Sequence, residues 1–157
     1  MHRIVLALAA TAALCACAHE TPPAAVAGMG WSLSQTDSEG AKLAYGLPQS
    51  DTVLLMLACQ PRSGQVQVSL TAPVGSPGAL EIASQGRRSR LQGQVSPGMG
   101  EGAVYVEAEA RVDDAALAGF ARSGDLTLTE GGRRAALPAR GVEQTAVGRF
   151  FAACRAA

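Results

Sequence analysis

The chain has 157 residues and a mass of 15.9 kDa, which suits one domain of ~100–150 residues preceded by a targeting segment. Its 13 basic side chains balance its 13 acidic ones, and the sequence pI is about 6.7. A nucleic-acid-binding domain needs a basic surface, so this balance argues against a nucleic-acid partner.

The first 16 residues predict a signal peptide. Residues 1–3 form a short basic start, and residues 4–14 are uncharged and mostly apolar. A helix that crosses a bilayer needs ~20 apolar residues, so this run is too short to span one. We therefore expect residues 1–16 to be removed on export. Residues 17–30 would then form a flexible Pro-containing tether, and residues 31–157 a single β-rich domain.

The end of the predicted signal peptide carries a modification motif. Leu14-Cys15-Ala16-Cys17 has an aliphatic residue three places before a cysteine and a small residue directly before it. The segment resembles the lipobox of bacterial lipoproteins. The resemblance implies cleavage before Cys17, diacylglycerol on its thiol and acylation of the new amino terminus, so that acyl chains bind the protein to a membrane. Ala18 is not the aspartate that resembles an inner-membrane retention signal, which favours the outer membrane and a domain that faces the periplasm.

Two alternatives to modification at Cys17 remain open. Lipidation at Cys15 would place Leu14 at the position that requires a small residue, which makes Cys15 the weaker candidate. An ordinary secretory signal would instead be cleaved after Ala18, within Ala16-Cys17-Ala18, and would leave a soluble exported protein.

Alternating apolar residues predict the first strands of the domain. Residues 31–34 and 41–45 alternate on either side of a polar run, which predicts a hairpin with Trp31 near Tyr45. Residues 52–59 are apolar on both faces, which is typical of a central strand covered on each side. Their hydrophobic face matches that of residues 65–71. A turn centred on residues 62–63 sets Cys59, Leu57 and Leu55 opposite Val66, Val68 and Leu70, respectively.

A short strand is predicted at residues 79–84, and a second matched pair follows at residues 88–95 and 104–109. Centring the turn near residues 97–99 places Arg90 opposite Glu107 and Arg88 opposite Glu109. Such cross-strand pairs of opposite charge favour one register. We expect this charged face to be solvated and self-neutralising, with a docking patch as the alternative.

The last third of the domain predicts two helices and two strands. Asp113-Asp114 is suited to begin a short helix near residues 113–121, with Leu117 and Phe120 facing inward and Gly124 ending it. Strands follow at residues 125–129 and 133–137, and then an amphipathic C-terminal helix near residues 142–155. Its apolar stripe comprises Val142, Ala146, Val147, Phe150, Phe151 and Cys154. The predicted fold class is mainly β, either a β-sandwich or a strongly curved antiparallel sheet of about nine strands, with these two helices.

Two cysteines remain once Cys15 is removed and Cys17 is acylated. An even pair in an exported chain favours a disulfide, so we expect Cys59 and Cys154 to be bonded. Cys154 lies on the apolar stripe of the last helix, and docking that helix on the strand of Cys59 brings the two thiols together.

The side-chain inventory argues against catalysis and against a metal or cofactor site. The mature chain has one histidine, His19, beside the predicted anchor, and Lys42 is its only lysine. A Ser-His or Cys-His nucleophile and a zinc site therefore lack their components. Glycine-rich residues 98–102 lie between two strands and predict a β-turn rather than a phosphate-binding loop. We expect no enzyme activity. A carboxylate-based hydrolase, which needs only two acids such as Glu107 and Glu109, is the least favoured alternative.

Aromatic residues and two resemblances bear on binding. Trp31 and Tyr45 are expected in the core, whereas Tyr105 lies on the polar face and, with Gly102, is the candidate binding surface. The residues 44–51, 55–59 and 150–154 resemble small exported proteins of Gram-negative bacteria, and the layout resembles the invasion-associated locus B type of secreted protein. Gly102-Ala-Val-Tyr105 resembles part of the Ser-Gly-x-x-Tyr loop of membrane-bound lysozyme inhibitors, which are small β-barrels, but Glu101 replaces the serine.

Together these features predict a non-catalytic binding module of the cell envelope. Acyl chains on Cys17 would hold it at the outer membrane, and its partner would be an envelope protein or glycan. A lysozyme-inhibitor-like lipoprotein is the alternative.

Overall fold

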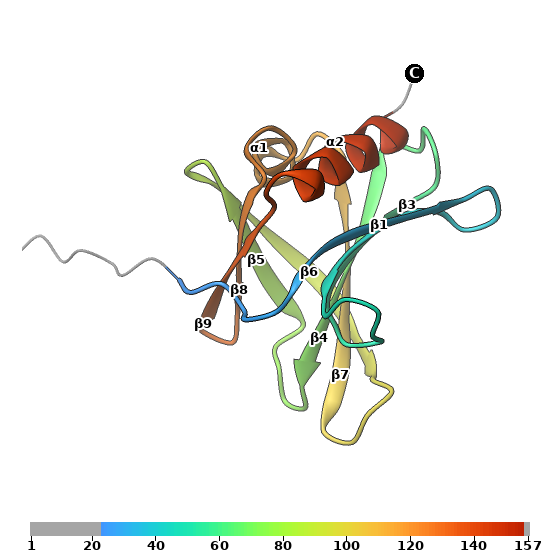
Figure 1. Ribbon diagram of the computed structural model, residues 1–157. Helices are drawn as coiled ribbons and strands as arrows, with labels where there is room; N and C mark the ends of the chain where they lie inside the picture. Colours follow the sequence, from blue (N-terminus) through green and yellow to red (C-terminus); the bar gives the residue numbers. More distant parts are fainter. Residues whose placement is uncertain (1–22, 156–157) are drawn as a thin grey trace, which may run out of the picture.

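The computed structural model describes residues 23–155, which form one antiparallel sheet and two helices (Figure 1). The predicted signal peptide and the predicted lipidation site Cys17 lie outside the described residues. The strands are β1 (Gly30–Thr36), β2 (Gly40–Gly46), β3 (Val53–Cys59), β4 (Gln65–Pro73), β5 (Ala79–Ser84), β6 (Arg87–Pro97), β7 (Ala103–Arg111), β8 (Asp125–Glu130) and β9 (Arg133–Pro138). The helices are α1 (Ala115–Ser123) and α2 (Val142–Cys154).

All nine strands belong to a single curled sheet with the order β1-β2-β3-β4-β7-β6-β5-β8-β9. Of the two predicted architectures, the strongly curved antiparallel sheet is confirmed and the two-sheet sandwich is wrong. The sheet curls into a half-barrel, and both helices lie across one end of it (Figure 1). Among the described residues, no helix covers the opposite end.

The long strand β6 is where the sheet bends. Its first part, residues 87–92, pairs with β5, and its second part, residues 93–97, pairs with β7. Gly93 stands at the changeover, and a Cβ atom there would lie only 2.7 Å from the backbone oxygen of Glu107. The close approach requires glycine at the bend, as is typical of glycine inside a strand.

The core lies between the concave face of the sheet and the two helices. Tyr45, Phe120, Phe150 and Phe151 are fully buried there. The Trp31 ring lies 5.2 Å from the Tyr45 ring and 4.9 Å from the Phe120 ring, measured between centroids. Trp31 and Tyr45 are also direct partners in the first hairpin, so this prediction is confirmed.

Residues of the two sheet edges are joined inside the curl. The Trp31 indole on β1 donates a buried hydrogen bond of 3.1 Å to the backbone oxygen of Leu137 on β9. The backbone N–H of Trp31 also donates to the Glu143 carboxylate of α2. These bonds tie the first strand to the last strand and the last helix, which holds the sheet in its curled form.

The predicted β3–β4 register is confirmed by the pairs Leu57 with Val68 and Leu55 with Leu70. The expectation that β3 is covered on both faces is wrong. Leu55, Leu57 and Cys59 are buried, but the opposite face of the strand is only half-buried. The helices cover the concave face alone, which explains the difference.

The predicted β6–β7 register is wrong by four residues. Glu107 pairs with Gln94 rather than with Arg90, and Arg88 instead forms an ion pair with Glu81 of β5. The turn is centred further along the chain than expected, because Pro97 pairs with Val104 and residues 98–102 form the connection. A four-residue shift keeps the same residues on each face, so the hydrophobic pattern is equally satisfied by both registers.

The helix boundaries largely agree with those predicted. The Asp114 side chain accepts hydrogen bonds from the backbone N–H groups of Ala116 and Leu117, and Gly124 ends α1 in a left-handed conformation. The sequence predicts Val142 on the buried stripe of α2, but the residue is 86% exposed. It is the first residue of that helix and lies beyond the part that packs on the core.

Candidate functional site

The predicted disulfide is present. Cys59 ends β3, Cys154 ends α2, and their Cα atoms lie 5.7 Å apart, within the range of an unstrained bridge. Two backbone N–H groups of the β3–β4 turn, from Arg62 and Gly64, donate to the oxygens of Ala153 and Cys154. The turn therefore satisfies carbonyl groups that the last turn of a helix leaves without partners.

The two residues of the predicted binding surface lie in different settings. Gly102 belongs to the β6–β7 turn and has a φ of 76°. Tyr105 lies within β7, paired with Thr71 on one side and Ser96 on the other, and is half-buried. The tyrosine is held in the sheet and not presented by the loop, which does not favour the inhibitor-type arrangement.

Glu107 and Glu109 line a polar pocket of about 470 Å³ on the outer face of the sheet. The remaining polar lining consists of Gln67, Gln92 and Gln94, and the Gln67 amide donates to the Glu107 carboxylate. Both acids project from one strand, two residues apart. They approach a ligand from the same side, whereas glycoside hydrolysis requires two acids that flank the bond.

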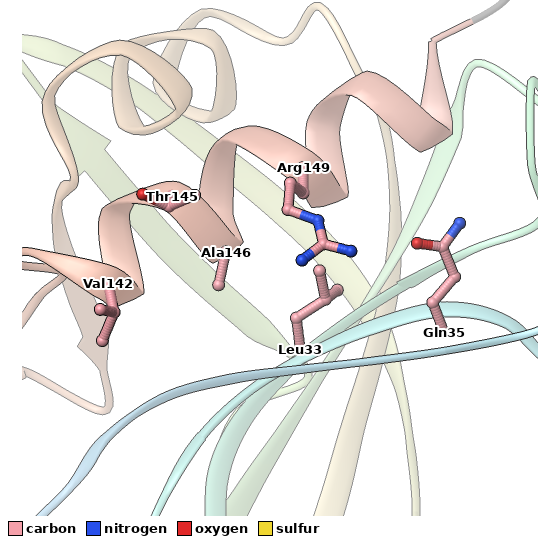
Figure 2. Close-up of a pocket in the computed structure, with 6 residues that line it drawn as sticks. All are labelled: Leu33, Gln35, Val142, Thr145, Ala146 and Arg149. Carbon is pink, nitrogen blue, oxygen red and sulfur yellow. The ribbon is translucent and has the colours of Figure 1, made fainter.

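A second pocket, of about 500 Å³, lies between β1 and α2. Figure 2 shows Leu33 and Gln35 on the strand, with Arg149 reaching from the helix toward Leu33. Its lining joins an exposed helix face to an exposed strand face.

The third hollow, here called the open-end cavity, has a volume of about 490 Å³ and lies at the end of the curled sheet away from the helices. This volume falls within the ~300–1,000 Å³ of small-molecule pockets. Leu70 and Ala72 of β4 and Leu128 of β8, three residues of the concave face, form part of its wall. Its other apolar lining residues are Val26, Met29, Leu54, Pro73, Ala103 and Ala135. The cavity thus continues the apolar interior to the surface.

Charged groups of the open-end cavity are contributed by the β8–β9 hairpin. Glu130 points to the concave side with Leu126 and Leu128, and only 7% of its side chain is exposed. Arg133 donates to the Glu130 carboxylate at 2.9 Å, and Arg134 lines the cavity beside it. Burial raises the pKa of Glu130, but hydrogen bonds from Ser76 and Arg133 outweigh that effect, so the pKa is lowered and the carboxylate is charged.

The described chain before β1 lines the cavity as well. It was expected to belong to a tether, yet Val26 and Met29 pack against the core. Ala25 bridges to Ala136 of β9, whose backbone N–H donates to the oxygen of Ala24. The residues directly before β1 therefore already belong to the folded domain and run along the last strand of the sheet (Figure 1).

Sequence reasoning missed the open-end cavity because it is built from six separate segments. One signal was available. Leu126, Leu128 and Glu130 alternate, so a strand extended by one residue places a carboxylate on the buried face. The predicted strand ends at residue 129, which leaves residue 130 in the connection to residues 133–137 and hides that signal.

Comparisons with protein-family models, with curated proteins and with solved structures find no match. Within residues 23–155, no group of three or more His, Cys, Asp or Glu side chains is arranged to hold a metal ion. No helix among the described residues is long and apolar enough to cross a membrane.

Proposed function

We propose that this chain is a non-catalytic binding module of the bacterial envelope, attached to the outer membrane by acyl chains on Cys17 and facing the periplasm. Two features support this setting. The lipobox-like segment Leu14–Cys17 supplies the attachment, and the Cys59–Cys154 disulfide suits an oxidising compartment.

The observation that carries the binding role is the open-end cavity. Apolar walls with a few polar groups at one place are typical of sites that bind small molecules. The cavity is also the place where the hydrophobic interior of the half-barrel reaches the surface. We propose that ligand binding, rather than turnover, is the activity of this domain.

The attachment is tested by replacing Cys17 with serine in the full chain. The variant should lose all labelling by radioactive or clickable palmitate and should move from the membrane fraction to the soluble periplasmic fraction. The Cys15→Ser variant is the matched control and should retain both the label and the membrane location. Undiminished labelling of Cys17→Ser would contradict the assignment, and loss of label only in Cys15→Ser would move the lipid to that residue.

A further inference from the structure

We propose that the open-end cavity binds the acyl chain of an anionic amphiphile drawn from the membrane, with the head group at Arg133. The acyl-binding part concerns residues 23–155 alone. The membrane as the source rests on the proposed attachment at Cys17.

The cavity has the chemistry of an acyl-chain site. Its wall is formed by aliphatic, methionine and proline side chains on β3, β4, β7, β8, β9 and the segment before β1. An apolar chain gains free energy when it leaves water for such a wall, in proportion to the area that it buries. A sugar or a peptide would have to leave its polar groups without hydrogen-bond partners against this wall, which disfavours both.

The charges at the cavity select the head group. The Arg133 side chain is 68% exposed, and its Nη2 donates to Glu130. A guanidinium carries five N–H donors, so Arg133 has further donors that can bind a carboxylate or a phosphate bidentately. Glu130 is charged and is held by Arg133 and Ser76, so it fixes the position of the arginine. The lining holds two arginines, Arg133 and Arg134, against one acid, Glu130, so its formal charge favours an anionic head group over a cationic one.

The position of the cavity points to the membrane as the source of the ligand. Val26 and Met29 line it, and they lie only nine and twelve residues after Cys17 in the sequence. An extended chain spans at most ~3.3–3.6 Å per residue, so attachment at Cys17 keeps the cavity within roughly 30–40 Å of the lipid surface. A ligand from that surface has a short path to the site.

Fatty-acid displacement tests the acyl site. We would use the full chain with Cys17→Ser, which removes the proposed anchor and keeps every residue of the cavity. Dansyl-labelled undecanoic acid should bind with one-to-one saturation. Dodecanoate should displace it at about tenfold lower concentration than dodecanol, since a charge-assisted hydrogen bond is worth that factor or more.

Filling the cavity should remove binding. Ala135→Phe places a ring on the concave side of β9 and should weaken dodecanoate binding at least tenfold. Ala83→Phe, an equal change on the outward face of β5, is the matched control and should leave the affinity unchanged. Met29→Trp fills the cavity from the segment before β1. It is the second filled variant, to be used if Ala135→Phe does not fold. Unchanged affinity in the folded filled variants, or no saturable binding by the starting chain, would overturn the proposal.

Vesicles test the source separately. The lipidated chain and the Cys17→Ser chain would each be mixed with vesicles containing an anionic phospholipid, repurified and examined by native mass spectrometry. We expect one bound phospholipid on the lipidated chain and a smaller bound fraction on the unanchored chain. Fatty-acid binding without phospholipid uptake would overturn the membrane source while leaving the acyl site intact. Equal phospholipid uptake by both chains would show that attachment at Cys17 does not promote loading of the cavity.

Discussion

Single residues decide how the open-end cavity is charged. Glu130 is a buried carboxylate whose side chain accepts from Arg133, and its pKa is lowered despite burial. An acid with a lowered pKa in the folded state contributes stability above its unfolded pKa. That contribution disappears as the pH falls through the folded value. We therefore expect the protonation of Glu130, a residue of the cavity wall, to lower the free energy of unfolding at acidic pH.

Replacing Glu130 with glutamine tests this link. At pH 7 the free energy of unfolding should fall by about 1 kcal/mol, because a charge-assisted hydrogen bond is lost. The difference from the wild type should begin to shrink as the pH falls below 4.5, the ordinary pKa of the group. It should disappear once the pH is below the lower pKa of the folded state, where both proteins carry a neutral side chain. Urea unfolding across this pH range measures it.

The control for this change is Glu101→Gln in the exposed β6–β7 turn, which should alter stability at pH 7 by no more than about 0.5 kcal/mol. A Glu130→Gln protein that is as stable as the wild type at pH 7 would contradict the account. So would a stability difference that persists unchanged well below pH 4.5.

At the scale of elements, the sequence predicted most of the strands and both helices. Capping residues predicted helix ends correctly, because Asp114 caps the start of α1 and Gly124 ends it. The β6–β7 register was not predictable, because a shift by an even number of residues preserves the faces and the charge pairs offered only weak guidance. The ion pair between Arg88 and Glu81 forms because β5 lies beside β6, and the sequence alone did not predict this neighbour.

The disulfide is the strongest single link between α2 and the sheet. Cys154→Ser opens a loop with a sequence separation of 95 residues, which should lower the free energy of unfolding by up to about 4–5 kcal/mol. Hydrogen bonds from Arg62 and Gly64 to the end of the helix remain and should keep α2 docked near neutral pH and room temperature.

Denaturant unfolding of Cys154→Ser, Cys59→Ser and the double variant measures this contribution. Because one bridge is lost in each case, the three proteins should be equally destabilised. Full stability in either single variant would contradict the link. So would two thiols that can be alkylated in the wild-type protein without reduction.

At the scale of the whole molecule, the cavity results from curling one sheet with helices at only one end. Composition and periodicity predicted a mainly β fold, either a sandwich or a curved sheet, but not which end of the sheet stays uncovered by the helices. That outcome depends on contacts between distant residues. Trp31 bonds to Leu137, α2 packs on β1 and β2, and the segment at Ala24–Ala25 joins β9. The predicted site at Gly102 and Tyr105 rests on the polar face of Tyr105 and on a resemblance to an inhibitor loop, and Gly102 also lines the cavity.

Photochemical labelling tests most directly that the open-end cavity is the binding site. A fatty acid with a diazirine at the end of its chain would be bound to the protein, illuminated, and located by mass spectrometry of the proteolytic peptides. The label should fall on residues of the cavity wall, namely Leu70, Ala72 and Leu128, and an excess of dodecanoate should remove it. A label on Leu33 and Val142, in the pocket between β1 and α2, would contradict the account.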